Sequence, residues 1–475
     1  MMAPHPAREL SCLNDDTEIV IIPLGFWADE TNANLSKTFS HVETAAYKIA
    51  SIDGALGRLQ LNAQFIAATK GATCLEIGEA VVADANRTLA NGVLWVNPHG
   101  KKVVLVGVVA YIMGDGPKLS LMSSHRHRHR KNCRVCLHDK HKSMDNAPFG
   151  QPRTPEATSE VIKEYINCAD EIEVMQRDPA LTAAAKQSAA KKITSRYDAA
   201  ANGISPGFNP FLALPRLDVH QDTVTDNLHF GPLGHNKYMW EYVKMLGFSL
   251  SDNVGAVEEF MSSMDGSSYA TMPTGKAIAK HYKAMAGADL KTIIQFMPFL
   301  LAAVLPTMPK SLRAEDITEH VENRRLILVL AMYTAALNKL LYLSSIEDKD
   351  KYLERVDTIS TSLYTVIRGN GVLWNKKGRN SVKVHQLVHL PDHVRFHGGF
   401  VDKSTEVFES SNRPVRVAIN GTTNRLNTDR DVARVMAYKT GMGYIGAGGQ
   451  WLDEGGNAQH ASRQLQALFQ DKDRG

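Results

Sequence analysis

Two apolar runs, EIVIIPLGFW at Glu18–Trp27 and KVVLVGVVAYIM at Lys102–Met113, decide the fold of this chain. Both are rich in β-branched residues, and continuous apolar runs of this length are typical of buried strands. The first run stops at Asp29 and the second stops at Asp115, 86 positions later. We therefore expect two core strands that each end on a carboxylate, although acids often do no more than end a strand.

Other segments extend this core into an α/β unit. Lys48–Ile52, Leu59–Ala68 and Gly92–Pro98 have strand-like patterns, and Cys74–Ala90 has helical spacing. A later strand-like piece, Val382–Leu390, is expected to complete the sheet. Helical periodicity dominates the long stretch in between.

The pattern predicts an α/β fold in which a mixed sheet is interrupted by a long, mostly helical insertion. The expected divisions are a first core part with a His/Cys segment, residues 18–140, a helical insertion, 141–375, a C-terminal core part, 376–440, and a Gly-rich, polar tail, 441–475.

Composition excludes few classes of protein. A hydrophobic content of 44% and a charged content of 22% are ordinary for a globular protein, and a net charge of +4 forces no nucleic-acid partner. Five cysteines with one CxxC favour a reducing compartment. We expect no membrane span, because Ile293–Leu305 is short and contains Pro298, and Leu326–Leu343 contains Asn338 and Lys339.

A basic His/Arg/Cys segment follows Asp115. His125, Cys133 and Cys136, with His138 or His141 as fourth ligand, could bind Zn²⁺, because thiolate and imidazole at CxxC spacing suit a tetrahedral site. The alternative is two reduced thiols in a turn.

The same segment has clustered cations that could contact DNA phosphates. The alternative is a solvated basic face. The cations expected to bind DNA are Arg126, Arg128, Arg130 and Lys131.

A series of short motifs extends along most of the chain, residues 20–435. They are DETNAN at 29–34, DGP at 115–117, CRVC at 133–136, HQDT at 220–223, DNLH at 226–229, HLP at 389–391, TE at 405–406 and ES at 409–410. Their order and spacing resemble the catalytic region of cut-and-paste DNA transposases of the Kyakuja–Dileera–Zisupton and Plavaka type, known mainly from fungal genomes. The resemblance implies an RNase H-like core, DNA as partner (transposon ends and target), and a nuclear location; it leaves a homo-oligomer open.

The resemblance also implies a DDE site for phosphodiester cleavage and strand transfer. Asp29, Asp115 and Glu406 would hold two Mg²⁺ or Mn²⁺ ions, with Glu409 a competing third acid one turn later. Asp226 and His229 resemble a helper element near the acidic site, and their spacing puts both on one helix face. The alternative is a capped helix with a hydrogen-bonded histidine.

Three functions remain open. The first is a metal-dependent transposase. The second is a domesticated, catalytically inactive descendant that binds DNA or protein, favoured by Leu121 where the family has an acid and by the lack of a recognisable DNA-docking domain before Glu18. The third is a zinc-stabilised helical scaffold with no nucleic-acid role.

Overall fold

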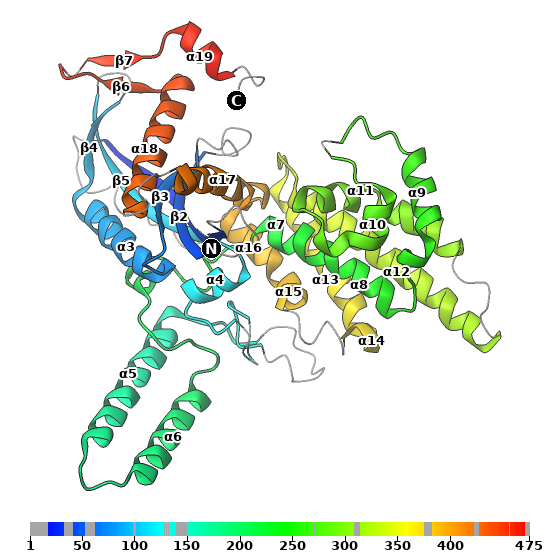
Figure 1. Cartoon of the computed structure of the whole chain (residues 1–475), viewed down its shortest axis with the longest axis horizontal. Helices are drawn as coiled ribbons and strands as arrows, with labels where there is room; N and C mark the ends of the chain where they lie inside the picture. The colour runs from blue at the N-terminus through cyan, green and yellow to red at the C-terminus, as the bar shows by residue number, and fades with distance from the viewer. Residues whose placement is uncertain are drawn as a thin grey trace. The chain divides into compact units, whose positions relative to one another are not determined.

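The structure is a computed structural model (Figure 1). It describes residues 18–32, 41–52, 62–97, 101–127, 129, 131, 133–138, 150–269, 271–307, 314–374, 382–421, 427–455 and 457–470. The chain forms two compact units. The sheet unit comprises Met1–His127, Thr154–Thr223 and Thr405–Gly475, and the helical unit comprises Arg128–Arg153 and Val224–Ser404.

The sheet unit contains a five-stranded mixed sheet with strand order β3-β2-β1-β5-β4. Its strands are β1 (Glu18–Asn32), β2 (His41–Ile49), β3 (Gln64–Thr69), β4 (Val93–Val96) and β5 (Lys102–Met113). β1 and β5 pair in parallel, whereas the other neighbouring strands run antiparallel. The prediction of a mixed α/β protein with both apolar runs in one sheet is confirmed.

The first core strand is longer than predicted. It passes Asp29 and continues to Asn32, because β2 pairs alongside it as far as Asn32 opposite His41. An acid does not end a strand where a neighbouring strand still satisfies the backbone hydrogen bonds.

The remaining elements of the sheet unit are mostly helices. They are α3 (Cys74–Asn91), α4 (Gly116–Met122), α5 (Pro155–Arg177), α6 (Ala183–Ala200), η2 (Pro210–Ala213), α17 (Glu406–Gly421), α18 (Thr428–Gly446), α19 (Arg463–Gln470) and the short hairpin β6 (Gln450–Leu452) with β7 (Ala458–His460). α5 and α6 form a helical hairpin (Figure 1).

Helices cover both faces of the sheet. α3 contributes Ile77 and Val82 to a core with Phe26 and Ala28 of β1. The opposite face is covered by α17 and α18, whose side chains form a second core with Val42 of β2 and Ala68 of β3. Side chains alternate along a strand, so Trp27 of β1 points to the face opposite Phe26 and Ala28, where it stacks on Phe408 of α17.

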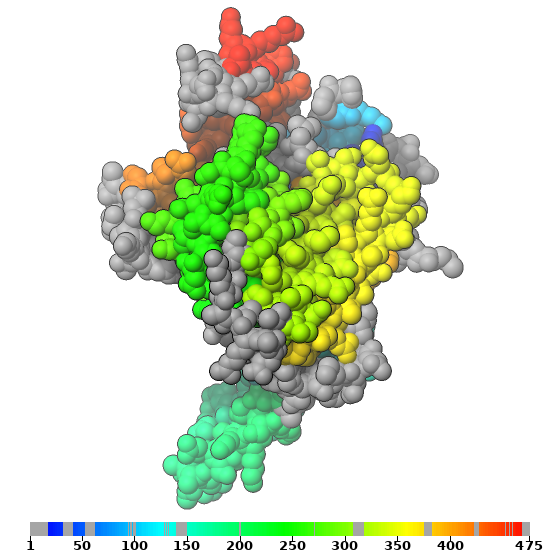
Figure 2. Space-filling model, turned by 90° about the vertical axis from the view of Figure 1, so that its right-hand side faces the viewer, coloured from blue at the N-terminus to red at the C-terminus, as the bar shows by residue number. Residues whose placement is uncertain are grey.

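The helical unit is built from short and long helices around one large core. They are α7 (Asn227–Phe230), η3 (Gly231–Asn236), α8 (Lys237–Met245), η4 (Leu250–Asn253), α9 (Val254–Ser263), α10 (Gly275–His281), η5 (Tyr282–Ala284), α11 (Gly287–Val304), η6 (Leu305–Thr307), α12 (Ala314–Leu341), α13 (Lys349–Gly369), α14 (Gly371–Leu373), α15 (Val382–Gln386), η8 (Leu387–His389), α16 (Leu390–His397) and η9 (Val401–Lys403). Figure 2 shows α9 to α13, green to yellow, as one continuous packed surface.

One helix in the described part of the chain, α11, is long and apolar enough to cross a membrane. α11 meets this test by its length and composition only, and half of the helix is buried within the protein. Its Leu290, Ile293, Met297 and Leu300 side chains lie in the core of the helical unit. A buried core helix passes the same test.

The predicted strand at Val382–Leu390 is wrong, because this segment is helical from α15 through η8 into α16. Val384, Leu387, Val388 and Val394 are buried in the core of the helical unit. Their spacing of three, four and ten places them on one helix face. The helical core therefore overrides the β preference of the valines.

Candidate functional site

The two acids predicted at strand ends, Asp29 and Asp115, lie just beyond two residues that are paired across β1 and β5. In the parallel pairing of β1 and β5, Trp27 lies opposite Met113. Asp29 and Asp115 each come two residues after this pair, so both reach the same edge of the sheet. Asp115 also caps α4, since its Oδ1 accepts a hydrogen bond from the backbone N of Lys118 at 2.9 Å.

The predicted third acid lies on α17, whose first turn carries both Glu406 and Glu409. Phe408, between them, stacks on Trp27 with ring centroids 5.0 Å apart and planes 9° apart. Trp27 and Asp29 are two apart on β1, so their side chains point to the same face. The first turn of α17 therefore packs on the face to which Asp29 points.

Among the described residues, two groups of metal-ligand side chains have ligand atoms within 4.8 Å of one another. They are Cys133, Cys136, His385 and His389, and Glu30, His41 and Glu43. Asp29, Asp115 and Glu406 belong to neither group. Ions in a two-metal site lie about 3.5–4 Å apart, so acids that share two ions need not converge on a single point.

The group at Glu30 and Glu43 encloses an ammonium. Lys118 Nζ pairs with Glu30 Oε1 at 2.6 Å and with Glu43 Oε1, and its side chain is only 6% exposed. Burial alone would lower the Lys118 pKa, but the two carboxylates outweigh burial and raise it. The hydrogen bond from Lys118 lowers the pKa of Glu30. Lys118 therefore carries the positive charge of this group.

The first group is built on a short turn that carries the CxxC motif. The segments around Cys136 and Pro152 form an antiparallel bridge, and Arg153 Nε donates to the carbonyl of Cys133 at 2.8 Å. Cys133 and Cys136 are both buried. The turn thus presents two thiols from a fixed backbone.

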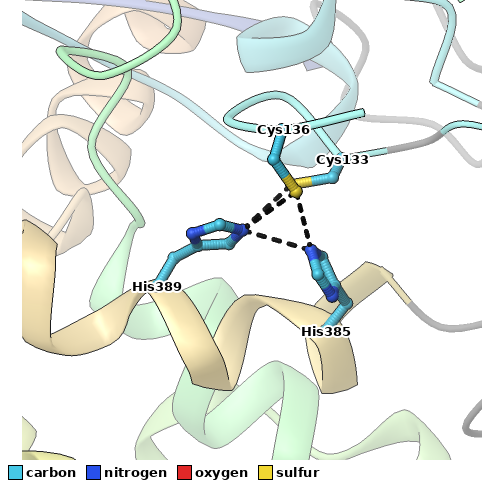
Figure 3. A group of neighbouring side chains, drawn as sticks. All are labelled: Cys133, Cys136, His385 and His389. Atoms are coloured by element: carbon cyan, nitrogen blue, oxygen red, sulfur yellow. Dashed lines mark hydrogen bonds between the residues drawn. The ribbon is translucent and has the colours of Figure 1, made fainter. Parts of the chain in front are cut away.

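The other two side chains come from the segment predicted as a strand. His385 and His389 are four residues apart on the helical path from α15 to α16, so they share one face. Both rings direct Nε2 toward the thiols, and all four side chains are buried (Figure 3). Arg134 reaches the Gln386 amide oxygen at 3.0 and 3.2 Å, which ties the turn to this helix.

The distances fit a tetrahedral zinc site. The Sγ to Nε2 distances are 3.5 Å for Cys133–His389, 3.2 Å for Cys136–His385 and 3.4 Å for Cys136–His389, and the two Nε2 atoms lie 3.1 Å apart. Bonds of about 2.3 Å to sulfur and 2.05 Å to nitrogen at tetrahedral angles require about 3.6 Å and about 3.3 Å. This buried group can bind a metal such as zinc.

The thiols already favour one thiolate. Burial alone would raise the pKa of Cys133, but the Cys136 thiol and the His385 and His389 rings outweigh burial and bring it well below its ordinary value. The pKa of Cys136 is raised, because it hydrogen-bonds to Cys133. Thiolate is the form that binds zinc, and binding releases the remaining protons.

The predicted ligands His125 and His138 are wrong, although the predicted cysteines are in the group. His125 lies in the sheet unit, where its backbone forms a bridge with Ile204. His138 stacks on the ring of His385, with centroids 3.9 Å apart, and is not one of the four ligands. His141 lies outside the described residues.

A sequence signal for the correct ligands existed. His385 and His389 have the H-x₃-H spacing that accompanies CxxC in many zinc sites. Cys136 and His385 are 249 positions apart in the sequence, so no local pattern reveals this pairing.

Asp226 and His229 meet as their spacing predicts. The Asp226 carboxylate caps α7 and accepts from the backbone N of His229 at 2.8 Å, and His229 Nδ1 lies 2.6 Å from its Oδ2. This geometry is a capped helix with a hydrogen-bonded histidine. A helper role for the pair stays a prediction.

The basic segment is described only in part. Arg128 and Arg130 lie outside the described residues. Arg126 donates to Asp198 on α6 at 2.9 Å and lies over the Tyr197 ring. The backbone N of Lys131 donates to His129 Nδ1. DNA binding by Arg126, Arg128, Arg130 and Lys131 stays a prediction.

No protein-family model matches this chain, and no curated protein matches it significantly. The case for a function therefore rests on the residues of the two sites.

Proposed function

We propose that the chain is a DNA transposase-like phosphoryl transferase with an RNase H-like core, of the Kyakuja–Dileera–Zisupton and Plavaka type. One observation carries the proposal. Asp29 and Asp115 follow the Trp27–Met113 pair of two adjacent parallel strands, and the helix with Glu406 packs on the same face through Phe408. An RNase H-like site has this arrangement of two strand acids and one helix acid.

Asp29, Asp115 and Glu406, or Glu409 in its place, would hold two Mg²⁺ or Mn²⁺ ions. Carboxylates at a partly exposed edge suit these ions, which prefer oxygen ligands and keep waters and substrate phosphate. Such ions activate the attacking water or 3′-hydroxyl and stabilise the leaving oxygen. Glu409 accepts a hydrogen bond from Thr405 at 3.0 Å, which orients its carboxylate within the first turn.

The zinc group would have a structural role. Four protein ligands fill a tetrahedral shell and leave no position for a substrate. Cys133 and Cys136 on the turn and His385 and His389 on the helix would be joined by one ion. This joins the two segments of the helical unit, Arg128–Arg153 and Val224–Ser404.

Nicking of supercoiled plasmid in Mg²⁺ or Mn²⁺ tests the proposed activity. We expect nicking by the parent and at least a hundredfold loss in Asp115→Asn and Glu406→Gln, since an amide keeps the shape and removes a charge. Glu79→Gln, an exposed acid on α3, is the matched control and should nick normally. If Glu409→Gln is inactive and Glu406→Gln is active, Glu409 is the third acid.

A parent that binds DNA but nicks in neither metal would overturn the enzymatic proposal. It would support the inactive, DNA-binding descendant instead. Leu121 favours that alternative, because it is an apolar side chain packed against the core of the sheet unit where the family has an acid. Either function would act on DNA in the nucleus.

A further inference from the structure

We propose that the exposed sides of α17 and α18 form a DNA-strand track that leads away from the acidic edge. The track consists of Arg413, Arg416, Arg430, Arg434 and Tyr438. The inference rests on the proposed function for the identity of the ligand as substrate DNA. It adds a binding site separate from the basic segment at residues 126–131.

On α17 two arginines lie on the same helix face as the two acids, further along the helix. Phe408, Val415 and Ala418 are buried against the sheet. Glu406 and Arg413 are seven residues apart, and so are Glu409 and Arg416. Residues seven apart on a helix share a face and lie about 10.5 Å apart along its axis. A strand whose phosphate sits at the acids therefore has its neighbouring phosphates within reach of these guanidinium groups.

α18 adds a second group of basic side chains. Val432 and Met436 are buried with Val415 of α17 in one core, so the two helices pack against each other, and Figure 1 shows them running in different directions. Arg430, Arg434 and Tyr438 recur every four residues on the solvent side of α18, and Tyr438 is 73% exposed. Both helices thus turn basic side chains to solvent.

Carboxylates on this surface are confined to the first turns of the two helices. Ser410–Gly421 and Val432–Gly446 contain no Asp or Glu, whereas Asp429 and Asp431 flank Arg430 in the first turn of α18. Asp429, next to Arg430, is bound by the Thr69 hydroxyl. Within the described part of the chain, the four track guanidinium groups form no ion pair or hydrogen bond, and they are not among the residues with further contacts.

Arginines elsewhere on the described surface are of two kinds. Arg87, Arg126, Arg177, Arg196 and Arg395 each pair with a nearby carboxylate. Arg325 and Arg463 are exposed and have no described partner. The four track arginines differ in being gathered on two helices that pack against each other, and such a cluster of positive charge attracts an external anion.

The side-chain types favour nucleic acid over other anions. Guanidinium groups bind phosphate through two parallel hydrogen bonds, and the track has arginine at all four cationic positions. An exposed tyrosine in line with them offers a ring on which an unpaired base can stack. An anionic membrane would instead favour lysines above a broad apolar face.

Binding of fluorescein-labelled DNA by the full chain, in EDTA and across a salt series, tests the track. We compare Arg413→Gln/Arg416→Gln and Arg430→Gln/Arg434→Gln with Lys191→Gln/Lys192→Gln, which removes the same charge from the exposed side of α6. Each track pair should weaken binding roughly tenfold and lower the salt slope by about 2, whereas the control should change neither. Tyr438→Ala should weaken binding of single strands more than of duplex.

The outcomes separate this inference from the proposed activity. Track variants that bind like the parent, or a control pair that weakens binding equally, would overturn the track. So would a parent that binds vesicles of anionic phosphatidylserine but not DNA. Suppose that the parent binds DNA tightly, that the track variants weaken this binding, and that the parent does not nick DNA in Mg²⁺ or Mn²⁺. That result would support the track and contradict the proposed nuclease activity. Circular dichroism of each variant confirms that it is folded.

Discussion

Trp27 on β1 and Phe408 on α17 stack face to face, with ring centroids 5.0 Å apart and an interplanar angle of 9°. Both rings are almost completely buried. The stack joins residues 381 positions apart in the sequence. Trp27 comes two residues before Asp29, and Phe408 comes two residues after Glu406. The stack therefore holds the first turn of α17, which carries Glu406, against the face of β1 that carries Asp29.

Phe408→Ala should destabilise the protein by about 3–5 kcal/mol, because it removes a buried ring and leaves a cavity beside Trp27. Urea unfolding of the purified protein measures the change. Phe396→Ala is the matched control, since Phe396 is also on a helix but is 65% exposed. The control should stay within about 0.5 kcal/mol of the parent. Equal stability of the two variants would show that the stack does not hold α17.

Zinc content tests the metal group directly. The parent should hold one zinc ion per chain by mass spectrometry of the metal, and Cys133→Ser or His389→Ala should lose it. Cys168→Ser is the control, because Cys168 is a buried cysteine that contacts Arg196 and Glu164 rather than histidines. Retention of zinc by His389→Ala, together with loss in His138→Ala, would restore the histidine predicted from sequence.

The parts of the fold with strong local signals could be predicted from the sequence. β5 has the predicted bounds, Lys102–Met113, because an unbroken apolar run has no competing pattern. α5 begins where predicted, since Thr154 caps it and Pro155 occupies its first position. The pairing of the two apolar runs in one sheet also followed, whereas the proximity of the Asp29 and Asp115 carboxylates stays a prediction.

The remaining features depend on contacts that no local pattern encodes. Val382–Leu390 contains enough valine to resemble a strand, but packing in the helical core makes it a helix. The error hid two members of the Cys/His group that can bind a metal, since only a helical path brings His385 and His389 onto one face. Whether the three acids share ions depends on carboxylate positions that no spacing specifies.

Lys118→Met should destabilise the protein by about 3 kcal/mol, because it leaves Glu43 buried without its cation. Adding Glu43→Gln to this variant should recover part of the loss, which denaturant unfolding of all four members of the cycle measures. Additive effects in the cycle would mean that Lys118 and Glu43 do not interact in solution.

The ion-pair group of Lys118, Glu30 and Glu43 should also make the stability of the protein depend on pH. The Glu30 pKa is lowered in the folded protein, so its contribution is present above the unfolded pKa and is lost as pH falls below it. The Lys118 pKa is raised, so its contribution is present below the unfolded pKa and is lost as pH rises through the folded value. Lys118→Met should therefore flatten the loss of stability at both extremes, as thermal melts from pH 3 to pH 11 would show.

Asp222 should reduce stability at neutral pH. Burial raises its pKa to about 7, so the folded state binds a proton that the unfolded state has lost. Stability then falls as pH rises from about 4 to about 7 and is level above that. Asp222→Asn should be more stable than the parent at pH 8 by roughly 3 kcal/mol, and equal to it near pH 4. Asp170→Asn, an exposed acid on α5, is the control and should follow the parent.

Gly114 allows a close approach between the start of α4 and β1. A Cβ at this position would lie 3.0 Å from the carbonyl oxygen of Ala28 and 3.2 Å from Cβ of Lys118. Gly114→Ala therefore requires one of these neighbours to shift by a few tenths of an ångström, and we expect that shift to change the position of Asp115 relative to Asp29. We expect a loss of about 1–3 kcal/mol in unfolding free energy and a loss of nicking at temperatures where the variant is fully folded.

Gly255→Ala is the matched control, because a Cβ on Gly255 meets nothing within 4 Å. Gly255 lies in α9, where alanine should stabilise the helix by about 0.5–1 kcal/mol. The decisive measurement is the Mg²⁺ concentration for half-maximal nicking, which should rise in Gly114→Ala because the acids no longer hold the ions at the same spacing. An unchanged Mg²⁺ requirement in a destabilised Gly114→Ala protein would show that the close contact serves only packing.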